Sequence, residues 1–184
     1  MFSMKRLLLL LTAFALLFSL AACRQTQEPE TTSDLPDQPD LAALADSIVQ
    51  TYALSGGLRY SSSSTIEGEY LDDDLIRSYY GDILSAPNFE EVEAYEVYID
   101  ESNPTQPCEF GLFRMRDGAD AEQFLSFLRA RIDLKIGNAV AYPTMDTEAL
   151  TTAKFSQSGA YLWYCAVKGA NAEIDQMFTD TLTH

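Results

Sequence analysis

Apolar residues recur every three or four positions in three segments of the chain, and this spacing predicts amphipathic helices. The first helix follows Asp40, which we expect as its N-cap, and ends at Ser55-Gly56-Gly57. The longest follows Asp120 and is expected to close at Gly137, and the last has Asn171 as its predicted cap. The three apolar stripes are Leu41, Leu44, Ala45, Ile48, Val49 and Tyr52; Ala121, Phe124, Leu125, Leu128, Ile132 and Ile136; and Ile174, Met177 and Phe178.

Four other segments have the character of strands. "EEVEAYEVYID" alternates, which places Tyr95, Val97 and Ile99 on one side and Val92, Ala94 and Tyr98 on the other. "CEFGLFRMR" follows after a turn-rich connection and is expected to pair with it as a hairpin. "TTAKFSQ" and "AYLWYCAVK" flank Ser158-Gly159 and form a second predicted hairpin.

The remaining segments complete the predicted order of elements. A short helix is expected over Asp73–Tyr80, closed by Gly81, after a polar stretch read as a loop or irregular hairpin. Residues 138–150 read as loop with one helical turn near Asp146–Leu150. The order is therefore α-α-ββα-ββα, and we predict an α+β fold with an antiparallel sheet of about four strands, in two hairpins, packed with helices.

The first residues have the pattern of an export signal. Lys5 and Arg6 precede an apolar run, Leu7–Leu20, of about 14 residues, which is shorter than the ~20 that a spanning helix needs. A charged start, a short apolar core and small residues before a break are typical of a secretory signal. The run ends in Leu20-Ala21-Ala22-Cys23, which resembles the lipobox of bacterial lipoproteins.

The lipobox implies a location. In that class the cysteine sulfur receives a diacylglyceryl group, so Cys23 would become the acylated first residue after removal of a signal peptide, residues 1–22. Two or more acyl chains, such as palmitate, would hold the protein stably on the extracytoplasmic face of the plasma membrane. Residues 23–39 would then be a lipidated cysteine and a disordered, proline-containing tether, and residues 40–184 one α+β domain. The alternative is an ordinary signal or an uncleaved anchor.

Charge excludes one class of partner. The chain has 12 basic and 28 acidic residues, a net charge of −16, and loss of Lys5 and Arg6 with the signal leaves 10 against 28, or −18. Nucleic-acid binders carry basic patches, so we expect no nucleic-acid partner. The acidic body would be soluble and would be repelled by anionic lipids, which leaves the lipid anchor as its membrane contact.

Three cysteines need an explanation. Cys23 is assigned to lipid, which leaves Cys108 and Cys165, both in strand-like segments and in an oxidising compartment. A disulfide between them is one reading, and two small buried thiols are the other.

No catalytic, metal or cofactor site is recognisable. His184, the one histidine, is the last residue of the sequence and a poor place for a base. Asp72, Asp73 and Asp74 are interpreted as the start of a helix, because they lack the spacing and the glycine turn of a calcium-binding loop. Two groups of side chains could serve either packing within the domain or recognition of a ligand. They are the aromatic residues Tyr60, Tyr70, Tyr79, Tyr80, Tyr161, Trp163 and Tyr164, and the cations Arg114, Arg116, Arg129 and Arg131.

Three stretches resemble a family of small lipoproteins of Gram-positive bacteria whose domain has no assigned function. They are "DDDLIRSYYGDIL", "EFGLFRMRDGADAEQFLSFLRARI" and "GAYLWYCAVKGANAEIDQMF", in this order over residues Leu41 to Leu182. The resemblance implies surface anchoring and the same layout of elements. It implies no activity and no catalytic residue.

Three functional hypotheses follow. The lipobox, the single small domain and the lack of a catalytic set favour a non-enzymatic binding or assembly module for an unknown protein or small ligand. The second is a carboxylate-dependent hydrolase acting on cell-wall or surface glycan, which needs two acids facing each other across a cleft. The third is a small-ligand sensor, which needs an enclosed apolar pocket with a few polar groups.

Overall fold

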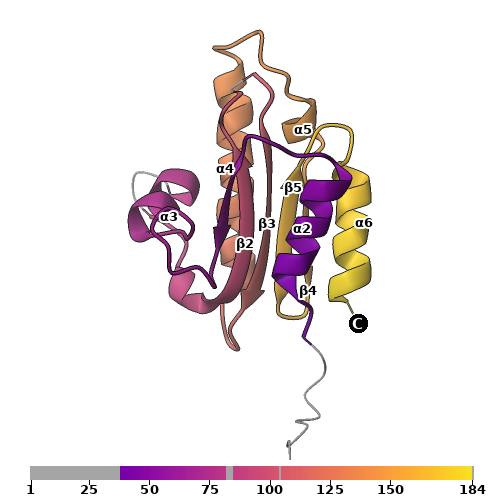
Figure 1. Cartoon of the computed structure of the whole chain (residues 1–184). Helices are drawn as coiled ribbons and strands as arrows, with labels where there is room; N and C mark the ends of the chain where they lie inside the picture. Colours follow the sequence, from indigo (N-terminus) through magenta and orange to yellow (C-terminus); the bar gives the residue numbers. More distant parts are fainter. Residues whose placement is uncertain (1–37, 82–84, 104, 184) are drawn as a thin grey trace, which may run out of the picture. The chain divides into compact units, whose positions relative to one another are not determined.

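The structure, a computed structural model, describes residues 38–81, 85–103 and 105–183 (Figure 1). The chain divides into two units, Met1–Gln38 and Pro39–His184, and all described residues except Gln38 belong to the second. The predicted signal, Cys23 and nearly all of the predicted tether lie outside the described residues. Within the described ranges, no helix has both the length and the apolar character that crossing a membrane requires.

Five antiparallel strands form one sheet in the order β1-β2-β3-β5-β4, so the predicted α+β class is confirmed. The two predicted hairpins are β2 (Val92–Asp100) with β3 (Cys108–Met115), and β4 (Lys154–Ser158) with β5 (Tyr161–Ala166). The pairing of β3 with β5 joins the hairpins into one sheet. The fifth strand, β1 (Leu58–Ser61), corrects the expected number of about four, and it pairs with β2 at the edge.

Helices cover both faces of this sheet (Figure 1). On one face lie α2 (Leu41–Thr51) and α6 (Asn171–Leu182), and on the other α3 (Asp73–Tyr80) and α4 (Ala121–Ala139). A single turn, α5 (Glu148–Thr151), precedes β4 and confirms the helical turn predicted near Asp146–Leu150. A short 3-10 helix, η1 (Phe89–Glu91), leads into β2.

The domain has two apolar cores, one on each face of the sheet, because successive strand residues point to opposite sides. On β3, Phe113 and Met115 pack with α4, whereas Phe110 and Leu112 pack with α2 and α6. Burial on both faces explains why the strands read as nearly continuous apolar runs. Among the described residues, the members of both cores lie between Leu41 and Leu182.

One strand prediction is wrong at a single position. Val92 was expected on the same side as Ala94 and Tyr98, but it lies in the core with Tyr95 and Val97. The cause is a shift of register between Val92 and Ala94, which inserts one extra residue opposite β3. Such a bulge reverses the alternation of side chains beyond it.

Helix ends confirm some predicted caps and correct others. Asp40 accepts a hydrogen bond from the Ala43 amide at 3.0 Å, as expected of an N-cap. Gly137, however, does not close α4, which continues to Ala139. Asn171 was expected to cap α6, but it is the first residue of the helix. Its side chain is engaged elsewhere: Oδ1 accepts from the Val167 amide at 2.6 Å, and Nδ2 donates to the Ala149 carbonyl at 2.9 Å.

Candidate functional site

The predicted lipidation site falls outside the described residues. Leu20, Ala21, Ala22 and Cys23 all belong to residues 1–37, so the lipobox stays a prediction. The other predicted site residues, Cys108 and Cys165, are described, on neighbouring strands β3 and β5.

Cys108 and Cys165 are free thiols on the same face of the sheet. Cys165 on β5 pairs with Phe110 on β3. Cys108 lies two residues before Phe110 on β3 and is therefore diagonal to Cys165. Burial is the main reason why the pKa of each thiol is raised to about 12. Diagonal neighbours across antiparallel strands have Cα atoms about 7–8 Å apart, beyond the usual span of a disulfide. The disulfide stays a prediction, and the register favours two thiols.

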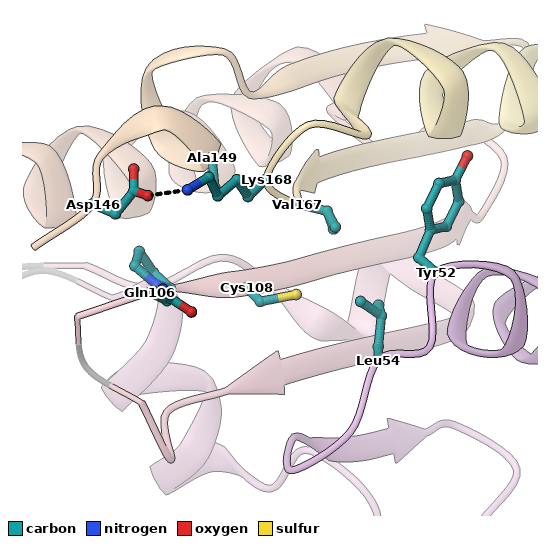
Figure 2. A pocket seen from close by; sticks show the side chains of 9 residues that line it. Tyr52, Leu54, Gln106, Cys108, Asp146, Ala149, Val167 and Lys168 are labelled. Carbon is teal, nitrogen blue, oxygen red and sulfur yellow. Dashed lines mark hydrogen bonds and ion pairs between the residues drawn. The ribbon is translucent and has the colours of Figure 1, made fainter.

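A small cavity opens beside Cys108 (Figure 2). Its volume is about 210 Å³, below the range of about 300–1,000 Å³ that is usual for small-molecule sites. Asp146 and Lys168 form an ion pair of 2.5 Å at its edge, which lowers the pKa of the carboxyl and raises that of the amine. The cavity is lined by Tyr52, Leu54, Gln106, Pro107, Cys108, Asp146, Ala149, Val167 and Lys168.

A buried cluster of charges lies on the opposite face of the sheet. The side chain of Glu109 is 0% exposed, and its two oxygens accept hydrogen bonds of 2.8 Å from Nε and Nη2 of Arg131. Lys135, one turn further along α4, donates to the same carboxylate. Arg131 also donates to the Tyr79 carbonyl at 2.9 Å, and its guanidinium lies 4.9 Å and 5.5 Å from the ring centres of Tyr79 and Tyr80.

The cluster keeps its members ionised. Burial disfavours the charged form of Glu109, but the charges of Arg131 and Lys135 outweigh burial and leave the pKa of this carboxyl below its usual value. Burial likewise opposes the charge on Arg131, and Glu109 outweighs that effect and raises the guanidinium pKa. The phenols of Tyr80 and Tyr164 share a hydrogen bond of 3.1 Å, and burial raises the pKa of both.

A groove of about 760 Å³ lies over this cluster, between α3 and α4. We call it the α4 groove, and it is lined by Ser78, Tyr79, Tyr80, Gly81, Ser85, Ser126, Phe127, Ala130, Arg131, Leu134, Lys135 and Asn138. A second cavity of about 340 Å³ shares Lys135 and Asn138 with it and continues to Tyr142 and Met145. The C-terminal half of α4 therefore borders both cavities.

The predicted aromatic cluster is divided between the two cores. Tyr60 and Tyr79 share a hydrogen bond of 2.9 Å between their hydroxyls, and Tyr80 joins Tyr164 as described above. Trp163 lies on the other face, where its Nε1 donates to Asp175 at 2.8 Å. These contacts support the reading of the tyrosines as the polar edge of a core.

The predicted cations do not gather into one patch. Arg114 forms an ion pair with Glu93, Arg116 donates to the Glu90 carbonyl, and Arg129 lies over the ring of Phe155. Arg131 is the exception, because it turns inward to Glu109. Two of the four, Arg114 and Arg131, pair with acidic side chains, and the separate contacts of all four do not form a shared site for an acidic ligand.

Several of the described acidic side chains make structural contacts. Asp72 caps α3 by accepting from the Leu75 amide at 2.8 Å. Buried Glu96 and Glu109 are each held by an arginine. Glu109 and Asp146 have lowered pKa values, whereas a general acid needs a raised one. Among the described residues, no group of three or more His, Cys, Asp or Glu side chains is placed to hold a metal ion.

Comparisons with models of protein families, with curated proteins and with solved structures give no significant match. Sequence reasoning missed the buried charge cluster around Arg131, although one signal was present. Arg131 follows Leu128 by three residues and Phe124 by seven, which places it beside the apolar stripe of its helix, where an arginine needs a buried partner.

Proposed function

We propose that this chain is a non-enzymatic binding module, held by lipid at Cys23 on the extracytoplasmic face of the plasma membrane. The anchor is supported by the signal-like residues 1–22 and by the sequence Leu20-Ala21-Ala22-Cys23. The resemblance to small lipoproteins of Gram-positive bacteria agrees with this placement.

One observation carries the binding role: three large apolar side chains are exposed within nine residues of the sequence, in the last turns of α4 and just after it. Leu134, Val140 and Tyr142 are 63%, 87% and 63% exposed, and they make up three of the five large apolar residues exposed in the described part of the chain. The same segment borders the α4 groove and its neighbouring cavity. Grouped apolar residues next to concave, partly polar surface are typical of interaction sites.

Cross-linking on intact bacterial membranes tests this role. A photo-cross-linking residue at Asn138, between the two cavities, should capture a defined partner from cells that display the wild-type lipoprotein. Tyr142→Asp should abolish the capture, because it places a charge in the apolar contact. Ile66→Asp is the matched control, since Ile66 is 60% exposed and lies outside this segment. The absence of any captured partner, or equal capture by both variants, would contradict the proposal.

A further inference from the structure

The charges under the α4 groove are unevenly matched. Two cations, Arg131 and Lys135, meet on the one buried carboxylate of Glu109. Glu109 is fully buried and neutralises one of them, so one positive charge at the floor of the groove is not matched by this buried carboxylate. In a body with an excess of acidic residues, this local excess of positive charge needs a counter-charge.

Among the residues that the structure describes, Glu101 supplies that counter-charge only loosely. Glu101 lies 3.6 Å from Nη2 of Arg131 and 4.0 Å from Nζ of Lys135, beyond the 2.7–3.2 Å expected of a hydrogen bond. Its side chain is 57% exposed, so it is free to move away into solvent. The contact is therefore a weak, screened attraction that a better-placed anion would replace.

Lys135 is the group that an anion would reach. Its side chain is 21% exposed and lines both the α4 groove and the neighbouring cavity. An ammonium has three donors, and the hydrogen bond to Glu109 uses one of them. Arg131 lies deeper, with 5% of its side chain exposed, and adds to the positive potential from below.

The side chains that line the groove favour a ligand with an apolar body. Phe127, Ala130 and Leu134 lie on one side of α4, at steps of three and four residues, and line the groove together with Tyr79 and Tyr80. Leu134 is 63% exposed, so an apolar ligand would bury surface that now faces water. A volume of about 760 Å³ falls in the range of drug-sized ligands.

We propose that the α4 groove binds a small amphipathic organic anion, whose carboxylate or other acidic group meets Lys135 and whose apolar body lies between α3 and α4. The positive charge of Lys135 favours an anionic group, and the apolar side chains that line the groove favour an apolar body. The inference rests on the proposed binding role of this part of α4. It does not depend on lipid at Cys23.

Two fluorescent probes of nearly the same shape test the inference on residues 24–184, which contain both apolar cores. Anilinonaphthalene sulfonate is an aromatic anion, and phenylnaphthylamine is the same ring system without the charge. We expect the anion to bind about 10-fold more tightly, since a charge-assisted contact in a partly buried site contributes to its affinity alone.

Variants decide whether the groove is the site. Glu101→Gln should tighten binding of the anion by about 2- to 5-fold and leave the neutral probe unchanged, because it removes the competing carboxylate. Lys135→Gln should weaken the anion by about 10-fold. Leu134→Ala should weaken both probes, and Lys154→Gln, at an exposed lysine of β4, should affect neither. Glu101, Leu134 and Lys154 are exposed, so these variants are expected to fold.

Equal affinity for the two probes, no binding of either, or no response to Glu101→Gln would overturn the inference. If Tyr142→Asp still abolished capture on membranes, the binding module would stand and only its ligand class would be wrong. If Cys23 carried no lipid while the probes behaved as described, the anchor alone would be wrong.

Discussion

The carboxylate of Glu109 and the guanidinium of Arg131 meet inside the domain through two parallel hydrogen bonds of 2.8 Å, which join β3 to α4. Neither side chain is more than 5% exposed. A planar fork of donors on a carboxylate is the strongest geometry available to an ion pair in proteins. This contact fixes the position of α4 over the sheet and so shapes the α4 groove.

Removing one member of this pair should destabilise the folded protein. Arg131→Met should lower the free energy of unfolding by about 3–5 kcal/mol, because a buried carboxylate loses its main partner. Glu109→Met together with Arg131→Met should recover much of the loss, since no uncompensated charge then remains in that pair. Urea denaturation measures both. Arg116→Met, at an exposed arginine, should change stability by about 0.5 kcal/mol or less, and a double variant no better than Arg131→Met would contradict the account.

The same pair predicts a pH dependence. Because the folded protein holds the pKa of Glu109 below its usual value of 4.5, the unfolded chain takes up a proton first as the pH falls. The stability that this carboxylate contributes is therefore complete well above pH 4.5 and is lost as the pH falls toward its lower folded pKa. The difference in unfolding free energy between wild type and Glu109→Gln should be constant from about pH 6 to 7 and shrink below about pH 4.5. A difference that stays constant to pH 3 would show that Glu109 does not titrate in this way.

Two glycines should respond oppositely to alanine. A Cβ on Gly111, in the middle of β3, would lie 2.6 Å from the ring of Tyr164 and 2.8 Å from that of Phe113, both packed in the core. Gly111→Ala should therefore cost about 1–3 kcal/mol of stability. A Cβ on Gly137, within α4, meets nothing within 4 Å, so Gly137→Ala should stabilise by about 0.5–1 kcal/mol. Thermal unfolding of the two variants checks this, and the same sign of change in both would contradict the described packing.

The two thiols should react slowly while the protein is folded. A pKa of about 12 leaves only about one thousandth of the thiolate present at a thiol of pKa 9 near pH 8. Cys108 lines a cavity and should be alkylated before Cys165, which is fully buried. Mass spectrometry after timed iodoacetamide treatment follows both sites. Rates close to those of the urea-unfolded chain would contradict the burial. A loss of two hydrogens from residues 24–184, which lack Cys23, would establish the disulfide instead.

Much of the fold was accessible from the pattern of apolar residues. The two hairpins and the short helix Asp73–Tyr80 were predicted because each has a clear period and a turn or cap at its ends. Strand β1 was missed because it has only four residues, of which Tyr60 alone is buried, and because a serine-rich stretch follows it. Its strand conformation depends on pairing with β2, which no local pattern reveals.

Other differences also arise from tertiary contacts. Gly137 lies within α4 although glycine usually favours a helix end, and Asn171 turns its side chain toward Val167 and Ala149 in place of capping α6. The charge cluster was missed for the same reason. Glu109 and Arg131 are 22 residues apart, and only the packing of α4 on β3 brings them together.

Mass spectrometry of the N-terminal peptide, from protein purified out of its own membranes, tests the central claim most directly. A membrane-anchored binding module predicts a chain that begins at Cys23 and carries a diacylglyceryl group on its sulfur. A chain that still contains residues 1–22, or one with an unmodified thiol at Cys23, would contradict it.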